Sequence, residues 1–260
     1  MTAPVTLITG ASAGIGAALA SVFAERGRAL VLMARREPQL KAVADMIEAR
    51  GRPRPRLMIV DLAQAGSVEK IDAELRAAGL DVQFLVNNAG FGLMGDATTL
   101  DRSEQLAMVD LNARVLTELS LRFVGSMTRH KGGILNVASL ASFMPGPGMA
   151  VYHATKAYVL SFTEALHQEL KVTGIRVTAL CPGPVETEFQ VRAGMPDGYF
   201  PPKLARSAER VAREGYDGLM RNKRVVVPGF DNQVVALLPR LMSRQSMLSL
   251  IARYRSSRKA

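Results

Sequence analysis

The chain has 260 residues, of which 48% are hydrophobic and 22% are charged, and its formal net charge is +10 at pH 7. This composition is typical of a globular protein, and the length suits one α/β domain with a large core. The single cysteine, Cys181, excludes an internal disulfide and favours a buried thiol in a reducing cytosol. Three scattered histidines without ligand spacing argue against a metal site.

No run of about 18 apolar residues predicts a membrane span. The first residues enter an apolar strand-like segment directly, without the basic region that opens a secretory signal. We therefore expect a cytoplasmic protein.

Short apolar runs alternate with longer segments of helical periodicity along the whole chain. This alternation predicts an α/β fold in which helices cover both faces of a parallel sheet of about seven strands. The predicted strands are Val5–Thr9, Ala29–Ala34, Arg56–Val60, Val82–Val86, Gly133–Ala138, Arg176–Leu180 and Arg224–Val227. The predicted helices lie near residues 15–26, 37–49, 66–77, 102–130, 151–172 and 207–220.

The helix near 151–172 has a periodic pattern that predicts one core-facing stripe. Its expected members are Ala154, Tyr158, Phe162, Ala165 and Leu166. His153 points about 100° away from its neighbour Tyr152 around the helix, so we interpret it as a structural residue or part of a pocket wall.

Two regions interrupt the alternation. Between Thr187 and Arg206 the chain is too rich in Gly and Pro for a regular element, which predicts a long functional loop. Residues 231–260 are predicted to form a basic amphipathic helical extension of a catalytic region at 1–230, with a break or restart at Pro239. This extension either belongs to the same single domain or is a peripheral tail.

Most of the net charge lies at the end of the chain. Residues 221–260 contain nine Lys or Arg and one acid, Asp231. Such a terminus attracts nucleic acid, anionic lipid or an acidic carrier protein, or is only a solvated end. No nucleic-acid-reading motif accompanies the charge, so no nucleic acid is expected. The apolar residues among the arginines fit either a membrane surface or packing over a substrate pocket or a partner subunit.

The first predicted strand leads into a turn that carries Gly10, Gly14 and Gly16, and a helical pattern follows. A strand, a glycine turn and a helix in this order are typical of a dinucleotide site. Glycines allow the backbone to approach a pyrophosphate, and the N–H groups at the start of the helix receive its charge.

A second motif combines Ser139, thirteen residues before Tyr152, with Lys156 at helical spacing after it. A tyrosine ordinarily titrates at about 10. Residues four apart on a helix share one face, so we expect the Lys156 ammonium to lower the pKa of Tyr152 and make its phenol a proton shuttle. The alternative is a common surface pair on a helix.

Together these motifs resemble those of the short-chain dehydrogenase/reductase family from about residue 4 to about residue 230. The resemblance implies a Rossmann-type doubly wound domain, a nicotinamide cofactor and hydride exchange between a carbonyl and an alcohol. The residues that carry it are the glycine turn, Asn87-Asn88-Ala89-Gly90, Asn112, Ser139, Tyr152, Lys156 and Pro182-Gly183.

The resemblance also implies four catalytic roles. Tyr152 transfers the proton to or from the substrate oxygen, and Ser139 hydrogen-bonds that oxygen. Lys156 lowers the pKa of the tyrosine and binds the nicotinamide ribose. Asn112 holds a water that links Lys156 to solvent.

The cofactor is predicted to be NADP(H) rather than NAD(H). Arg35, which lies 19 residues after Gly16, is found where an NAD enzyme carries a carboxylate, and Arg36 follows it. An arginine there accommodates a 2′-phosphate. Ala13 replaces a basic residue of many NADP-type relatives, which removes one phosphate contact. The implied cofactor-binding residues are Gly10, Ser12, Ala13, Gly14, Ile15, Gly16, Arg35, Arg36, Asp61, Leu62, Asn88, Ala89, Gly90, Tyr152, Lys156, Pro182, Gly183, Val185 and Thr187.

The expected substrate wall is apolar and rich in sulfur, which suits a lipophilic carbonyl compound or secondary alcohol. An alternative of the same class is a 3-oxoacyl-carrier-protein reductase, and one of a different class is a non-catalytic regulatory or nucleic-acid-binding protein. The helices near 102–130 and 151–172 resemble those that pair subunits in the family, so we expect a homodimer or homotetramer. The predicted substrate-binding residues are Ser139, Phe143, Met144, Tyr152, Met195 and Tyr199.

Overall fold

Seven parallel strands form one sheet with the order β3-β2-β1-β4-β5-β6-β7 in the computed structural model, which describes residues 2–196 and 198–256. The strands confirm the seven predicted ones to within about two residues at either end. Their bounds are β1 Ala3–Thr9, β2 Leu30–Ala34, β3 Arg56–Ile59, β4 Leu80–Asn87, β5 Gly133–Val137, β6 Arg176–Leu180 and β7 Val225–Val226.

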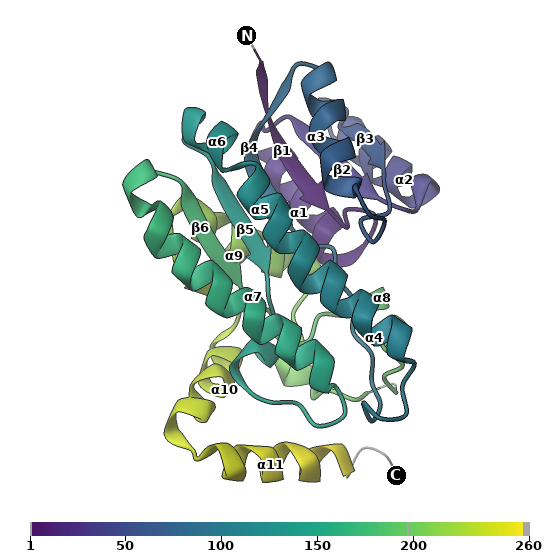
Figure 1. Cartoon of the computed structure of the whole chain (residues 1–260), viewed down its shortest axis with the longest axis vertical. Helices are drawn as coiled ribbons and strands as arrows, with labels where there is room; N and C mark the ends of the chain where they lie inside the picture. The colour runs from purple at the N-terminus through teal and green to yellow at the C-terminus, as the bar shows by residue number, and fades with distance from the viewer. Residues whose placement is uncertain (1, 197, 257–260) are drawn as a thin grey trace.

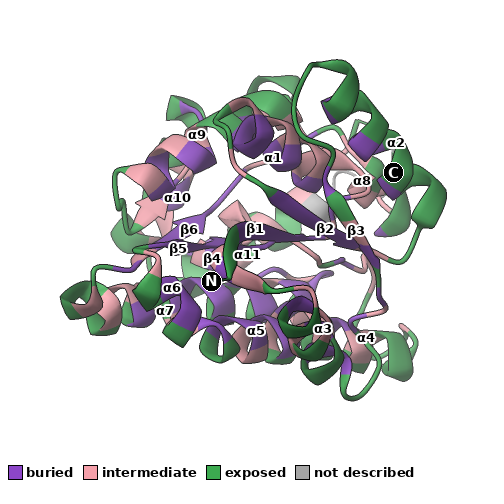
Figure 2. Cartoon of the chain, turned by 90° about the horizontal axis from the view of Figure 1, so that it is seen from above, coloured by how far each residue is buried: buried purple, intermediate pink, exposed green. Residues whose placement is uncertain are grey.

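Helices cover both faces of this sheet, as Figures 1 and 2 show. One layer contains α1 (Gly14–Glu25), α2 (Glu37–Ala49) and α9 (Ala208–Met220). The other contains α3 (Ser67–Ala77), α4 (Arg102–Val109), α5 (Leu116–Arg122), α6 (Val124–Arg129) and α7 (Ala150–Glu169). The predicted doubly wound α/β fold is therefore confirmed.

Neighbouring residues of the central strands enter different cores. On β1, Ile8 belongs to the cluster beneath α1, whereas Leu7 belongs to the cluster on the opposite face. Successive side chains of a strand point to opposite faces, so a sheet covered on both sides requires continuous apolar runs. The strand order reverses between β1 and β4, which is where ligands bind in open α/β sheets.

The helix predicted near 102–130 is not continuous. A π-helical turn at Asp110–Val115 separates α4 from α5, and a break at Phe123 separates α5 from α6. Single π turns inside α-helices occur frequently at functional sites. Here the turn contains the buried Asn112.

The prediction of no regular element between Thr187 and Arg206 was wrong in part. The segment contains α8 (Glu188–Arg192) and a 3-10 turn at Pro202–Leu204. A capping box starts α8: the Thr187 side chain accepts a hydrogen bond from the Phe189 amide, and the Gln190 side chain accepts one from the Thr187 amide. This reciprocal cap outweighs the glycine and proline content that follows it.

The C-terminal extension forms α10 (Phe230–Leu241) and α11 (Arg244–Ser256) at the end of the molecule where the strands finish (Figure 1). The predicted break at Pro239 was wrong, because Pro239 lies inside α10. Only one donor is lost there, and the backbone becomes extended three residues later, at Met242. Residues 257–260 of the predicted extension lie outside the described residues, and the boundary at residue 230 stays a prediction.

The predicted core stripe of α7 was wrong in part: Leu166 is buried and Phe162 packs against the core, but the other three members do not. Ala154 and Ala165 are exposed, and Tyr158 is 44% exposed. Polar side chains face the sheet instead because they find partners there: Lys156 Nζ donates to the Val137 carbonyl at 2.8 Å, and Thr163 Oγ1 accepts from Asn136 at 3.0 Å. The buried residues are Tyr152, Thr155, Lys156, Val159, Leu160, Thr163 and Leu166.

Candidate active site

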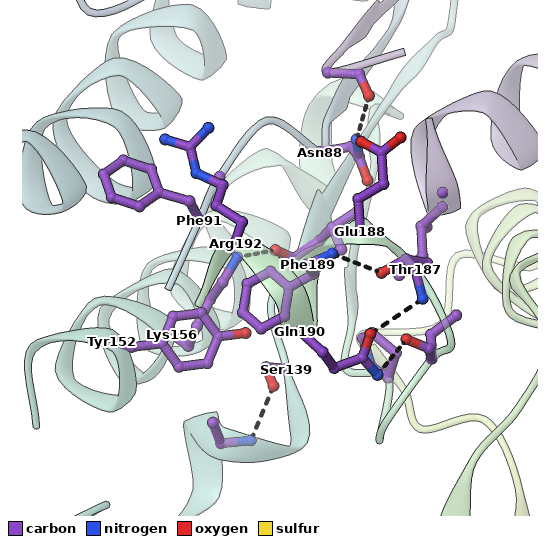
Figure 3. A pocket seen from close by; sticks show the side chains of 18 of the residues that line it. Asn88, Phe91, Ser139, Tyr152, Lys156, Thr187, Glu188, Phe189, Gln190 and Arg192 are labelled. Atoms are coloured by element: carbon purple, nitrogen blue, oxygen red, sulfur yellow. Dashed lines mark hydrogen bonds between the residues drawn. The ribbon is translucent and has the colours of Figure 1, made fainter. Parts of the chain in front are cut away.

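A cleft of about 1040 Å³ lies at the carboxyl edge of the sheet. Its walls include the glycine turn after β1, the loops after β4, β5 and β6, the start of α7, and parts of α8 and α11. Figure 3 shows the side chains that converge on its centre. The motifs predicted from the sequence therefore meet in one place.

The glycine turn is shaped for close backbone approach. Gly10 and Gly14 have φ of +64° and +54°, which favour glycine. A Cβ on Gly16 would overlap the carbonyl oxygen of Gly10 and lie 2.5 Å from Asn88 Nδ2. The N-cap of α1 is Ala13, no side chain caps the helix, and its first turn carries no acid. Such a helix start fits the pyrophosphate of a dinucleotide.

A network around Thr9, which the sequence analysis missed, joins the ends of β1 and β4. Thr9 Oγ1 accepts hydrogen bonds from the amides of Asn88 and Ala89, both at 2.9 Å. In return, Asn88 Nδ2 donates to the carbonyls of Thr9 and Gly10 at 3.0 and 3.1 Å. These bonds hold the Asn88–Gly90 loop against the glycine turn. A lone threonine before a glycine is too common a pattern to have indicated this role.

Ser139, Tyr152 and Lys156 come together on the α7 side of the cleft (Figure 3). The Ser139 side chain lies near the Tyr152 phenol and accepts a hydrogen bond from the Ala141 amide at 3.1 Å. Lys156 Nζ lies 5.9 Å from the centroid of the Tyr152 ring. The predicted proximity of the three side chains is thus present.

The electrostatics of Tyr152 and Lys156 differ from the expectation. Burial raises the pKa of Tyr152 to about 12, although the nearby Ser139 hydroxyl acts to lower it. Burial lowers the pKa of Lys156 to about 8. The Lys156 ammonium donates a hydrogen bond to the Val137 carbonyl. The pKa of the Tyr152 phenol is therefore determined mainly by desolvation and not by the charge of Lys156. The phenol is therefore protonated at neutral pH and can donate a proton.

Asn112 lies behind the cleft wall and supports it. Its amide donates to the Phe91 carbonyl at 2.9 Å and to Thr155 Oγ1 at 3.2 Å, and it accepts from the Phe91 amide at 3.1 Å. A Cβ on Gly90 would lie 2.8 Å from Asn112 Oδ1 and 3.6 Å from Lys156 Nζ. Asn112 and Lys156 thus both lie close to Gly90, while the water contact stays a prediction.

Both predicted cofactor arginines lie at the cleft. Arg36 Nη2 is 3.3 Å from Ser12 Oγ and 2.8 Å from Glu188 Oε2. Arg35 Nη1 is 3.9 Å from Asp61 Oδ2, at the edge of an ion pair. The guanidinium of Arg36 therefore sits beside the glycine turn, where a phosphate on the ribose is expected.

The helix α8 bridges the two sides of the cleft. On one side, a Cβ on Gly14 would lie 3.0 Å from the methyl group of Thr187. On the other, the ring centroids of Phe189 and Tyr152 are 5.3 Å apart, and the Ala193 carbonyl accepts from the Met94 amide at 2.8 Å. Sequence reasoning missed Glu188, Phe189 and Arg192 here, although the Thr187-x-x-Gln190 spacing is a capping-box signal.

The far end of the cleft is apolar and includes the C-terminal extension. Met144, Met195 and Tyr199 line it as predicted. Phe143 does not: it packs on the buried cluster that contains Leu160 and Cys181. The extension contributes Val235, Ile251 and Tyr254, which were not among the predicted substrate-binding residues.

Tyr254 joins α11 to the loop after α8. Its hydroxyl donates to the Tyr199 carbonyl at 2.6 Å, and the two rings lie 5.8 Å apart at 79°. Of the two interpretations of the extension, packing over the pocket is thus found in the structure.

Two polar residues take the structural roles predicted for them. His153 Nδ1 hydrogen-bonds the Met144 carbonyl at 2.8 Å, and burial lowers its pKa. Cys181 is fully buried, and burial raises the pKa of its thiol to about 12. Neither group is poised for catalysis.

Most of the predicted site residues line this cleft. The three that do not are Gly16, Asn112 and Phe143. Those that do are Gly10, Ser12, Ala13, Gly14, Ile15, Arg35, Arg36, Asp61, Leu62, Asn88, Ala89, Gly90, Ser139, Met144, Tyr152, Lys156, Pro182, Gly183, Val185, Thr187, Met195 and Tyr199.

Comparison with known proteins supports the same family as the motifs. The family model described as short chain dehydrogenase matches residues 4–196. The chain belongs to the short-chain dehydrogenase family. It is therefore an oxidoreductase that acts on alcohol or carbonyl substrates. In the part of the chain that the structure describes, no helix has the length and apolar character needed to span a membrane.

Similar proteins agree in fold and in length. Sulfoacetaldehyde reductase 2 of Chromohalobacter salexigens is 38% identical over 73% of this chain and 76% of its own length. A short-chain dehydrogenase from Sphingobium yanoikuyae in complex with NADPH is 32% identical, with a TM-score of 0.80 over 95% of each chain. The bulky-bulky ketone specific alcohol dehydrogenase of Comamonas testosteroni is 28% identical, with a TM-score of 0.78 over 96% of this chain and 95% of its own.

Proposed function

We propose that the protein is an NADP(H)-dependent oxidoreductase that interconverts a carbonyl and a secondary alcohol on a lipophilic small molecule. The observation that carries the proposal is that Ser139, Tyr152 and Lys156 line the same cleft as the glycine turn, with Lys156 Nζ 5.9 Å from the centroid of the Tyr152 ring. This is a proton donor next to a dinucleotide-shaped cradle. Such a set argues against the alternative of a non-catalytic regulatory or nucleic-acid-binding protein.

When bound, the nicotinamide supplies or accepts the hydride, which is the cofactor's own chemistry. In reduction, the Tyr152 hydroxyl donates its proton to the substrate oxygen, which Ser139 holds by a hydrogen bond. Lys156 stabilises the phenolate that forms, since an ammonium favours the charged phenol. In oxidation, the same phenolate accepts the alcohol proton.

Three features support NADP(H). Arg36 and Ser12 lie together beside the glycine turn, and Arg35 adds a second guanidinium. Guanidinium matches phosphate in charge and in hydrogen-bonding geometry. The structure of the similar Sphingobium yanoikuyae enzyme is of its complex with NADPH. Ala13 supplies no contact of its own to the phosphate.

The substrate class is proposed from the walls of the cleft. Methionines and aromatic rings from the loops after β5 and α8, with Ile251 and Tyr254 from α11, favour a lipophilic carbonyl compound. The similar Comamonas testosteroni enzyme is specific for bulky ketones. A 3-oxoacyl-carrier-protein reductase remains the alternative, in which an acidic carrier docks on the basic residues of the chain.

A panel of small, bulky and thioester-linked ketones, assayed with NADPH and with NADH, tests the proposal. Tyr152→Phe should reduce kcat by about 10²–10⁴-fold, because a positioned proton donor contributes that much. NADPH binding should remain. Tyr158→Phe, which removes an exposed phenol bonded to Thr117, is the matched control and should keep its activity. Retention of more than a tenth of kcat in Tyr152→Phe would contradict the acid role.

We also propose self-association through the outer face of α7. Ala154, Ala157 and Tyr158 are exposed there, and the Tyr158 ring stacks on Phe162 at 6.0 Å. Small and aromatic residues on a 20-residue helix suit a two-fold helix interface. Light scattering at micromolar concentration should give at least twice the chain mass of 28.1 kDa. The monomer mass would contradict this.

A membrane contact is proposed only for the outer face of α10. Phe230 and Leu241 are 76% and 82% exposed on one stripe with Val234 and Leu237, and Arg240 is exposed beside them. Apolar side chains next to arginine suit an anionic bilayer. Leu241→Glu should abolish co-sedimentation with anionic vesicles at low salt.

Val172→Glu is the matched control for this experiment. Val172 is 92% exposed and lies after α7, outside the extension. The control should therefore sediment like the wild type. Failure of the wild type to sediment would refute the membrane contact.

A further inference from the structure

One guanidinium joins three elements at the mouth of the cleft. Arg36 is the N-cap residue of α2, Ser12 belongs to the glycine turn, and Glu188 is the first residue of α8. Arg36 Nη2 lies within hydrogen-bonding distance of both Ser12 Oγ, at 3.3 Å, and Glu188 Oε2, at 2.8 Å. A carboxylate from α8 thus occupies the anion-binding position of this arginine.

The surroundings of Arg36 are rich in positive charge. Arg35 approaches its acid, Asp61, only to 3.9 Å. Arg192 forms no ion pair in the part of the chain that the structure describes, and its guanidinium lies 4.4 Å from the centroid of the Phe91 ring. Burial and the nearby Arg35 lower the pKa of Arg192. Like charges held together in this way favour an anion, and Glu188 supplies one.

We propose that Glu188 competes with the ribose 2′-phosphate of the cofactor for Arg36, and thereby limits the preference for NADP(H) over NAD(H). This inference rests on the proposed use of NADP(H). A guanidinium binds carboxylate and phosphate through the same N–H groups. Arg36 must therefore release Glu188 or hold two anions close together, and both cost binding free energy. A cofactor that lacks the phosphate does not meet this cost.

The same ion pair has a second effect that must be separated from the first. It ties α8 to the start of α2, so its loss should loosen the bridge over the cleft. A looser bridge would weaken the binding of NADPH and of NADH equally, because the two cofactors differ only in the 2′-phosphate. In the ratio of the two dissociation constants that common effect cancels, so the ratio measures only the contribution of the 2′-phosphate to binding.

The test is Glu188→Gln, which keeps the shape of the side chain and removes its charge. Dissociation constants for NADPH and NADH are measured by fluorescence titration, without substrate, at low and high salt. The ratio Kd(NADH)/Kd(NADPH) should rise by about fivefold, because an exposed ion pair contributes at most about 1 kcal/mol. The 65% exposure of Glu188 sets this modest scale. High salt should shrink the rise.

The matched control is Glu186→Gln. Glu186 is exposed two residues earlier, and no ion pair involves it among the described residues. Its substitution removes the same charge from the same segment and should leave the ratio near the wild-type value. An equal rise in both variants would overturn the inference, and so would an unchanged or lower ratio in Glu188→Gln.

A second background shows whether the effect passes through Arg36. In Arg36→Gln, adding Glu188→Gln should leave the ratio unchanged, since the contested group is gone. A fivefold rise in that background would overturn the assignment to Arg36. The wild-type ratio separately tests the proposed cofactor: a value below one would refute NADP(H) preference, whereas the inference depends on the change between variants.

Discussion

Replacing Lys156 by methionine should stabilise the cofactor-free protein at neutral pH while removing its activity. Lys156 is 6% exposed, and burial lowers its pKa from 10.5 to about 8. The folded state therefore disfavours the charged form that predominates at pH 7. Methionine has a similar length and no charge to desolvate. A functional group held at the expense of stability is common in active sites.

The size of the effect follows from this pKa. A decrease of roughly 2.5 units corresponds to about 3 kcal/mol of unfolding free energy, at about 1.4 kcal/mol per unit. The lost bond from Lys156 Nζ to the Val137 carbonyl, 2.8 Å long, opposes this gain. Such a bond contributes about 1 kcal/mol. The net gain is about 2 kcal/mol, which should raise the Tm by about 4–8 °C.

The gain should depend on pH with a defined sign. Below pH 8 the lysine is charged in both the folded and the unfolded state, and the wild type carries the whole penalty. Between pH 8 and 10.5 the folded state loses its proton first, so the penalty falls as pH rises. The advantage of Lys156→Met should therefore nearly vanish by pH 10.

Urea unfolding at pH 7 and pH 10 measures this difference. Lys171→Met, at an exposed lysine just beyond α7, is the control and should change stability little at either pH. A variant that is no more stable than the wild type at pH 7 would refute the reasoning. So would a gain that is equally large at pH 10.

Two further predictions concern the two ends of the cleft. Gly16→Ala should weaken NADPH binding at least tenfold in a titration, because its Cβ would overlap the Gly10 carbonyl; Gly125→Ala in α6, where a Cβ meets nothing closer than 3.9 Å, should bind normally. Tyr254→Phe removes the bond to the Tyr199 carbonyl, so the KM for a bulky ketone should rise about threefold to tenfold while that for a small ketone stays constant. Equal KM changes for both ketones would exclude a role of α11 in shaping the substrate end.

The sequence predicted the sheet because its signals are local and consistent. Each strand is a short apolar run, and a segment with helical periodicity separates each run from the next. This alternation favours one parallel sheet covered by helices. The meeting of Gly10, Ser139 and Tyr152 followed from the resemblance. All three lie at or beyond the carboxyl ends of strands, which share one edge of the sheet.

What the sequence did not predict depends on contacts between distant segments. Thr155 and Lys156 look like surface residues by composition, yet they are buried, because Thr155 bonds Asn112 of the π turn and Lys156 bonds the Val137 carbonyl of the sheet. The pKa of Tyr152 depends on how deeply the fold buries it, which helical spacing cannot give. Tyr254 lies 55 residues from its partner Tyr199, so no local pattern indicated which residues of the extension reach the pocket.

The π turn at Asp110–Val115 sets a limit on how this part of the chain can vary. A π turn holds one residue more than an α turn, so the helix before it and the helix after it are rotated by about 100° relative to a continuous α-helix. Ala107 on α4 borders the cleft, whereas Leu116 and Leu119 on α5 are buried in the core. Inserting or deleting one residue here would rotate one of the two helices, so that either the residues of the cleft wall or those of the core face would point towards solvent. Substitutions should be tolerated at this point far better than changes in length.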